Sequence, residues 1–260
     1  MSATFDRWRG IGWELLREAP YPPALNLALD EVLTRRVGAG LRPPTLRFWA
    51  WATPAVILGR FQSVRNEVDE AAARELGVQV VRRISGGGAM FVEPGATITY
   101  SLYLPEALVA GLTFPDSYAA LDSWVVDGLR ELGVDAWYAP LNDIASAEGK
   151  IGGAAQARRA RAVLHHTTVS YEMAADRMLR VLRIGQEKLS DKGIASAAKR
   201  VSPLRRQTDL PRAAIVEHLI ARFRDRFGLV DGALTPEELA AAERLVREQF
   251  ATEKWTYDLP

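Results

Sequence analysis

Lys150 stands in the most unusual chemical setting of this 260-residue chain. It enters a stretch of small residues, Gly152 to Ala155, which would leave room for a ligand beside a strand. A lysine there could pair with a carboxylate or a phosphate as a point charge. Asn142 and Asp143 precede it, and a carboxylate offers the oxygen ligand that Mg²⁺ requires. Taken alone, the segment fits an exposed hairpin with a solvated lysine even better.

The run Arg82 to Ala89, RRISGGGA, is the second candidate. Three consecutive glycines let a backbone approach a ligand closely, and free N–H groups there can bind an anion. Strand alternation would point Arg82 and Arg83 to opposite faces, so at most one of them reaches the same ligand. The run matches neither the phosphate-binding loop of P-loop proteins nor the dinucleotide fingerprint. A glycine-rich hairpin turn is the structural alternative.

His165 and His166 are the third candidate. Alternation along a strand places only one of them on the face of a site. Adjacent strand residues diverge and no third ligand is spaced nearby, so the pattern disfavours a metal site. A core or edge histidine that makes one hydrogen bond explains the pair equally well.

Composition excludes several classes of protein. With 33 Lys+Arg against 32 Asp+Glu, the net charge of +1 gives no electrostatic reason to expect nucleic acid or an anionic membrane as partner. The chain has no cysteine, which removes disulfides, thiolate nucleophiles and metal–thiolate sites. The N-terminus lacks the apolar core of a signal peptide, and no apolar run approaches the roughly 20 residues of a membrane span. We therefore expect a soluble, cytoplasmic protein.

Hydrophobic periodicity predicts the elements that carry these residues. Strands occur in runs and as hairpins, which favours an α+β fold with a mixed, largely antiparallel sheet flanked by helices. We expect one domain over 1–260, with 211–260 as a helical C-terminal portion that opens its last helix with a capping box at Thr235. Ile98, Tyr100, Leu102 and Leu104 recur at every second position of the strand expected over 97–104, so one of its faces should be buried and the other exposed. The expected helices span 25–33, 69–76, 117–132, 173–182, 213–227 and 236–250, and the expected strands span 45–58 (two around a turn), 78–84, 97–104, 151–157 and 163–171.

Taken in order, these segments resemble the lipoate–protein ligase A family within the biotin/lipoate ligase and octanoyltransferase superfamily. The similarity runs from about residue 13 to the C-terminal end. It is greatest to the short ligases that lack an extra C-terminal domain and can depend on a separate accessory subunit. The matching stretches are NLALDE (26–31), LRF (46–48), VILGRFQ (56–62), RRISGGGAMF (82–91), LNDI (141–144), KIGGAAQ (150–156) and HHT (165–167).

The resemblance implies a fold related to class II synthetase catalytic domains and a reaction in two steps. A lipoate or octanoate carboxylate would attack the α-phosphate of ATP in the presence of Mg²⁺, giving an acyl-adenylate and pyrophosphate. A lysine of an acceptor protein would then attack the acyl-adenylate to form an amide. The acceptors implied are lipoyl domains of 2-oxoacid dehydrogenase E2 components and the glycine-cleavage H protein.

The resemblance also implies roles for individual residues. Lys150 would be catalytic, neutralising charge that develops between the acyl carboxylate and the α-phosphate. Asp143 would help to hold Mg²⁺, and Val56 to Leu58, Phe61 and Met90 would form a slot for the apolar tail. The implied substrate-binding and nucleotide-binding residues are Arg82 (favoured over Arg83), Ser85, Gly86, Gly87, Gly88, Ala89, Asn142, Asp143, Gly153, Ala154 and His166.

One departure keeps other functions open. Where many family members carry a His-Asp pair after the glycines, this chain has Val92-Glu93. The departure favours a catalytically silent lipoyl- or acyl-binding module as the alternative. Octanoyl transfer through a cysteine thioester is excluded because the chain has no thiol, which leaves a cysteine-independent octanoyltransferase. Biotin ligation ranks third, and a basic patch at Arg158 to Arg161 would recognise the acceptor protein.

Overall fold

The chain folds into a mixed, largely antiparallel sheet with helices on both faces, which confirms the expected fold class. The computed structural model describes residues 7–17, 19–183 and 201–259. The strands are β1 (Glu14–Arg17), β2 (Thr45–Trp49), β3 (Ala55–Leu58), β4 (Gln79–Arg82), β5 (Met90–Val92), β6 (Thr97–Pro105), β7 (Ala136–Ala139), β8 (Asp143–Ser146), β9 (Gly149–Arg159), β10 (Ala162–Ser170) and β11 (Val230–Asp231). Eight of them form the main sheet, in the order β11-β1-β2-β6-β10-β9-β8-β7, and three form a smaller sheet in the order β4-β3-β5.

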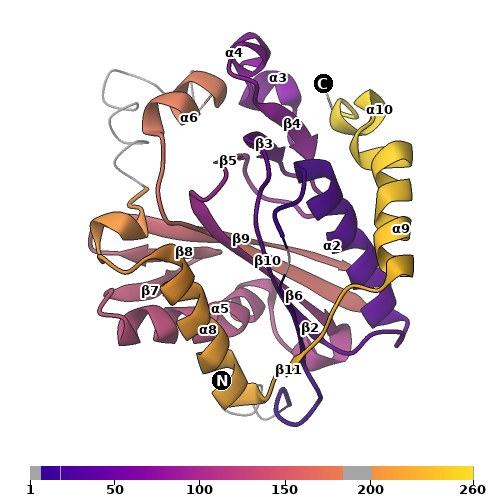
Figure 1. Ribbon diagram of the computed structural model, residues 1–260, viewed down its shortest axis with the longest axis vertical. Coiled ribbons are helices and arrows are strands. Elements are labelled where there is room, and N and C mark those ends of the chain that lie inside the picture. The colour runs from indigo at the N-terminus through magenta and orange to yellow at the C-terminus, as the bar shows by residue number, and fades with distance from the viewer. Residues whose placement is uncertain (1–6, 18, 184–200, 260) are drawn as a thin grey trace.

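The helices form two layers around the main sheet (Figure 1). They are α2 (Pro23–Gly38), α3 (Val64–Glu67), α4 (Glu70–Glu75), α5 (Phe114–Glu131), α6 (Ala175–Val181), α8 (Arg212–Phe227), α9 (Pro236–Leu245) and α10 (Glu253–Thr256). Helices α2 and α9 cover one face, and α5 and α8 cover the other. The smaller sheet lies with α3, α4 and α6 at one end of the molecule (Figure 1). No helix among the described residues is both long and apolar enough to span a membrane.

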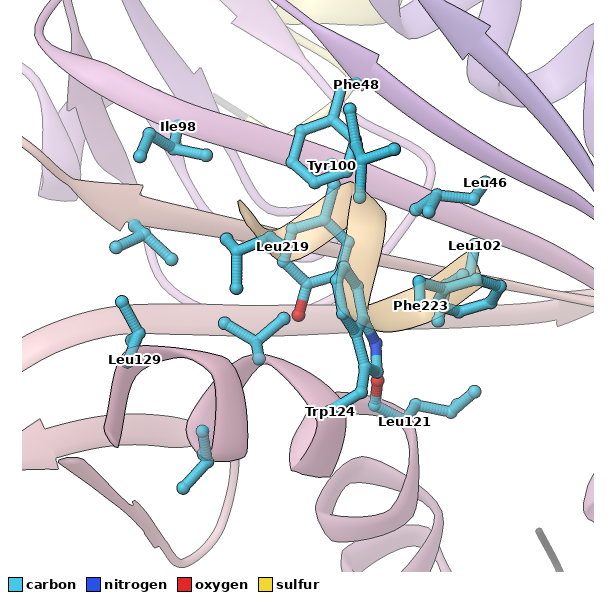
Figure 2. Close-up of a cluster of buried hydrophobic side chains, with 14 of the residues drawn as sticks. Leu46, Phe48, Ile98, Tyr100, Leu102, Leu121, Trp124, Leu129, Leu219 and Phe223 are labelled. Carbon is cyan, nitrogen blue, oxygen red and sulfur yellow. The ribbon is translucent and has the colours of Figure 1, made fainter. Parts of the chain in front are cut away.

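An aromatic cluster joins α5 and α8 to the main sheet (Figure 2). Trp124 of α5 meets Tyr100 of β6 and Phe223 of α8 edge-on, with ring centroids 5.0 and 5.1 Å away. The opposite face of β6 is buried beneath α2, where Tyr103 belongs to a second core. The expectation of a half-buried strand is therefore wrong, because helices cover both faces of the sheet at β6.

The two strands expected around Pro54 form, but they do not pair with each other. β2 joins the main sheet beside β1 and β6, whereas β3 is the centre of the smaller sheet, parallel to β4 and antiparallel to β5. The chain thus leaves the main sheet at Pro54. The glycine run 86–88 follows β4 and is held by this smaller sheet.

The C-terminal portion over 211–260 contains α8, α9 and α10 together with the short strand β11. Thr235 and Glu238 form the predicted capping box at the start of α9. β11 pairs in parallel with β1 at the edge of the main sheet, and α8 packs against α5. This portion is therefore continuous with the rest of the fold rather than appended to it.

The aromatic cluster leads to a stability prediction. Trp124 is fully buried, whereas the side chain of Trp137 is 38% exposed. We expect Trp124→Ala to lower the free energy of unfolding by about 3–5 kcal/mol, the usual cost of emptying a large aromatic site. Trp137→Ala should change it by no more than about 1 kcal/mol. Urea denaturation measures both, and equal losses would show that the cluster does not hold the layers together.

Candidate active site

The side chain of Lys150 folds back over a strand that has almost no side chains of its own. A Cβ built on Gly153 would lie 3.0 Å from Lys150 Nζ, so the glycine leaves room for the ammonium at its present position. Lys150 Nζ lies 2.7 Å from Asp143 Oδ1 on the neighbouring strand β8. The small residues of β9 therefore leave room for a charged pair close to the strand, and Lys150 has a carboxylate partner although its side chain is 42% exposed.

Lys150 lines a cavity of about 500 Å³ that β9 and the glycine run share. Small-molecule sites commonly have volumes of about 300–1,000 Å³. Arg83, Asn142 and His166 contribute polar groups to its lining. Gly88 and Ala89 line it from the glycine run, and Gly152 to Ala155 line it from β9. The structure thus brings together parts of all three segments that the sequence singled out.

Part of the cavity lining is apolar. Its larger apolar side chains are Met90, Phe91, Met173, Met178 and Leu182. Of the residues expected to form an apolar slot, Met90 lies there, but Val56 to Leu58 belong to buried cores and Phe61 is 79% exposed. The slot expected from β3 is therefore corrected to one formed mainly by β5 and α6, where unbranched methionines can adapt to a flexible chain.

Arg82 does not reach the cavity, although it was the favoured arginine. Its side chain is fully buried and donates to main-chain carbonyls of Gly59, Gln62 and Thr256. Trp255 Nε1 donates in return to the carbonyl of Arg82. Burial lowers the pKa of Arg82, and nearby Arg60 lowers it further. Arg82 therefore ties the C-terminal turn to β4, and its expected contact with a substrate phosphate is not found.

Arg83, on the opposite face of β4, is the arginine that lines the cavity. Nη2 donates to the carbonyls of Gly86 at 2.6 Å and Gly88 at 2.9 Å, and Nε donates to Ser85 Oγ at 3.0 Å. Burial lowers the pKa of Arg83 to about 10, so the guanidinium remains charged near neutral pH. Arg83 thus sets the shape of the glycine run through its carbonyl groups.

The bonds to Arg83 also determine where the loop N–H groups point. The C=O and N–H groups of a trans peptide are antiparallel, so the N–H groups of Gly87 and Ala89 point away from the guanidinium that binds the carbonyls of Gly86 and Gly88. Within the described part of the chain, neither N–H group donates a hydrogen bond to the protein. Free amides of this kind can bind an anion.

His166 connects the glycine run to helix α2. Its Nε2 lies 2.7 Å from Ser85 Oγ, and its Nδ1 lies 2.8 Å from Asp30 Oδ2. All three side chains are buried, and only His166 among them lines the cavity. Burial lowers the pKa of His166 despite the opposing effect of Asp30, so the ring is neutral at physiological pH. Ser85 is therefore part of the support of the site and not of its lining.

His165 lies on the other face of β10, as alternation predicted. Its Nε2 is 2.7 Å from Asp122 Oδ1 of α5, and its Nδ1 is 3.2 Å from Gln156 Nε2. Tyr100 and Thr167 also donate to the same aspartate oxygen. His165 is thus paired with Asp122 of α5, whereas His166, which the resemblance assigned to the site, is paired with Asp30 of α2.

Asn142 and Asp143 lie at the start of β8, and their side chains have different partners. Asn142 lines the cavity and donates from Nδ2 to the carbonyl of Ala154. Asp143 Oδ1 is paired with Lys150, and the residues that the structure describes contain no group of three or more His, Cys, Asp or Glu side chains able to hold a metal. One carboxylate already occupied by an ammonium does not fit a protein-held Mg²⁺ site, so the expected metal role of Asp143 is not supported.

Two further expectations concern charged residues at the periphery. Glu93, which departs from the pattern of the resemblance, lines the cavity but forms an ion pair with Arg177 of α6. In the basic segment 158–161, Arg158 lies over the ring of Phe114 at 4.3 Å and Arg159 is paired with Glu31. Both arginines therefore have partners within the chain, which reduces the free charge of the expected docking patch.

Sequence reasoning missed the role of Asp30. It is 1% exposed and holds His166, Ser101 and Tyr103 through its two oxygens. The signal was present in the sequence, because a carboxylate within the apolar pattern of a helix must find partners when it is buried. Which partners it finds depends on pairings between strands far apart in the chain.

The chain belongs to the family described as the lipoyl protein ligase A/B catalytic domain, whose model matches residues 22–224. An octanoyltransferase LipM from Symbiobacterium thermophilum is 30% identical over 271 residues, covering 94% of this chain and 97% of that protein. The bipartite lipoate protein ligase of Thermoplasma acidophilum has a similar structure, with a TM-score of 0.84, 30% identity, and coverage of 96% of this chain and 97% of the other. A lipoate-protein ligase A bound with ATP gives a TM-score of 0.81 at 26% identity over 96% and 99% of the two chains. The expected family is thus confirmed.

The glycine run leads to a second stability prediction. Gly87 has a φ of +89° and an added Cβ would lie 2.9 Å from Arg83 Nη2, whereas one on Gly88 would meet nothing within 4 Å. We expect Gly87→Ala to lower the free energy of unfolding by about 1–3 kcal/mol. Gly88→Ala should change it by less than about 1 kcal/mol. Chemical denaturation of both variants tests this, and a Gly87 variant as stable as the Gly88 variant would contradict it.

A third prediction concerns pH. The folded pKa of His166 lies below the value of 6.5 that it has when unfolded, so the unfolded state takes up a proton first as the pH falls. The contribution of His166 to stability is complete above about pH 6.5 and is lost as the pH falls through the folded pKa. We expect the difference in unfolding free energy between wild type and His166→Gln to shrink between about pH 8 and about pH 5. A difference that stays constant or grows would refute the assignment.

Proposed function

We propose that this chain is an ATP-dependent ligase that joins lipoate or octanoate to a lysine of an acceptor protein. Lys150 in the cavity is the observation that carries the proposal. Its ammonium lies over Gly153, and Gly88 and Ala89 of the glycine run line the same cavity. Membership of the lipoyl protein ligase A/B family supports the acyl chemistry, and the ATP-bound relative supports the nucleotide.

The residues of this chain suit both steps of such a reaction. In the first, an acyl carboxylate oxygen attacks the α-phosphorus of ATP and pyrophosphate leaves. In the second, a lysine amine attacks the acyl carbon, AMP leaves and the amine loses a proton. Negative charge develops at the same place in both steps, where Lys150 can move from Asp143 to the reacting oxygens. The apolar lining around Met90 and Met178 would hold the acyl tail.

Lipoyl domains are the acceptors we propose. The structure of the bipartite ligase from Thermoplasma acidophilum is described together with its E2 lipoyl domain, which supports an acceptor of this kind. The bipartite character of that relative also supports a separate accessory subunit. The glycine-cleavage H protein is a second acceptor within the same proposal.

Octanoyl transfer from an acyl thioester is the second candidate, because the relative from Symbiobacterium thermophilum is named an octanoyltransferase. Since the chain has no cysteine, no thioester can form on it, and the acceptor amine would attack the acyl carrier thioester directly. This reaction needs no ATP. The two candidates are therefore distinguished by the acyl donor.

The test uses purified protein with ATP, Mg²⁺, lipoate or octanoate and an apo lipoyl domain, and it reads the intact mass of the acceptor. We expect addition of one acyl group and release of pyrophosphate. Lys150→Ala should lower the rate by about 10²–10³-fold, the usual effect of removing one group that stabilises transition-state charge. Lys254→Ala, an exposed lysine on α10, is the matched control.

Two outcomes would overturn the ligase. Acylation from octanoyl acyl carrier protein in the absence of ATP would establish the second candidate. A protein that binds lipoate but releases no pyrophosphate, with or without an accessory subunit, would be a silent acyl-binding module.

A further inference from the structure

Four buried side chains form one hydrogen-bonded chain from helix α2 to the glycine run. Asp30 Oδ2 lies 2.8 Å from His166 Nδ1, and His166 Nε2 lies 2.7 Å from Ser85 Oγ. Ser85 Oγ in turn lies 3.0 Å from Arg83 Nε. None of the four is more than 7% exposed. The chain is therefore almost entirely buried up to the cavity wall, which His166 and Arg83 line.

The chemistry of the end groups fixes the direction of every hydrogen bond in this chain. Arg83 can only donate, so Ser85 accepts from it. The Asp30 carboxylate can only accept, so His166 carries its proton on Nδ1, and Nε2 of the neutral ring accepts from the Ser85 hydroxyl. A carboxylate at position 30 is the acceptor that selects this tautomer, as second partners of histidine commonly do.

Asp30 is itself held firmly. Its Oδ1 accepts hydrogen bonds from Ser101 at 3.0 Å and from Tyr103, both on β6, and Arg47 lies 3.8 Å away. Burial raises the pKa of Tyr103 well above its usual value, and Asp30 adds to the effect, so Tyr103 remains a donor. The position of the carboxylate is thus set by the main sheet, independently of the glycine run.

We propose that Asp30 is a positioning residue for the glycine run, acting through His166 and Ser85 on Arg83. Arg83 holds the carbonyls of Gly86 and Gly88, so its orientation decides where the free N–H groups of the run point. The role of this loop in binding an acyl phosphate rests on the proposed function. The link between Asp30 and the geometry of the loop does not.

The opposite face of β10 supplies a matched control. Asp122 is fully buried, accepts from His165, Tyr100 and Thr167, and lies on a helix that covers the sheet, just as Asp30 does. Its network continues from His165 through Gln156 to Ser117. Neither Asp122 nor His165 lines the cavity. Asp122→Asn therefore removes an equivalent buried charge without breaking the chain to Arg83.

The experiment compares Asp30→Asn with Asp122→Asn in the full chain. The N–H groups of Gly87 and Ala89 make no hydrogen bond to any residue that the structure describes, so the loop is followed by its mobility. NMR order parameters of residues 85–89 should fall from a rigid value of about 0.85 to below about 0.6 in Asp30→Asn, since one buried hydrogen bond to a charged group is lost. Asp122→Asn should leave the order parameters of this segment unchanged. Nitrogen chemical shifts of His166 should show loss of the Nδ1–H tautomer only in Asp30→Asn. In the ligase assay, kcat for pyrophosphate release should fall by about tenfold in Asp30→Asn alone.

Several outcomes would overturn the proposal. An equal fall of the loop order parameters in both variants would reduce Asp30 to a general contributor to stability, and unchanged order parameters in Asp30→Asn would remove the link altogether. If Asp30→Asn does not fold, Ser85→Ala breaks the same chain at its centre and should reproduce the fall of the loop order parameters. Recovery of a peptide acylated on Ser85 would make the serine a nucleophile and refute a positioning role. If wild type shows no acyl transfer, the proposed function fails, while the loop order parameters still decide the role of Asp30.

Discussion

Successive side chains of a strand alternate between the faces of a sheet, and at β10 this places His165 under α5 and His166 under α2. Each histidine meets a buried aspartate from its covering helix, at 2.7 Å for Asp122 and 2.8 Å for Asp30. A buried carboxylate is costly unless it is hydrogen-bonded, so a shift of either helix along the sheet would leave an unpaired charge. The two pairs therefore fix the positions of α5 and α2 along the main sheet. His166 lines the cavity, so the position of the site depends on the same contacts.

Several positions of the site are glycines, whose missing side chains leave space for other groups. Gly153 clears the space that Lys150 Nζ occupies, and the glycine run lets Arg83 turn backbone carbonyls inward and N–H groups outward. The charged and polar groups at the cavity thus include Lys150, Arg83 and the main chain of the glycine run. The net charge of the whole protein is near zero and gives no strong overall field. An anion would therefore be attracted by the local charges and main-chain dipoles at the cavity.

The sequence predicted the fold class, the longer helices and the three segments that meet at the cavity. It failed where the outcome depended on pairing between distant strands. Whether Arg82 or Arg83 faces the cavity depends on which side of β4 the C-terminal turn covers. The local sequence pattern does not show which side that is. The short strands that no prediction included, such as β5 and β11, are defined by their partners rather than by their own periodicity. Asp30 could be recognised as part of the site only from its hydrogen bond with His166 on β10.

Arg83 and Lys150 bring positive charge to the cavity under opposite constraints. All three guanidinium nitrogens of Arg83 donate to groups of the protein, and the side chain is 4% exposed, so moving it would leave several buried carbonyls unpaired. Lys150 has one carboxylate partner and its side chain is 42% exposed, so an entering carboxylate or phosphate can replace Asp143 at little cost. The two residues therefore have different tasks: the arginine keeps the loop in shape, whereas the lysine is free to change its partner.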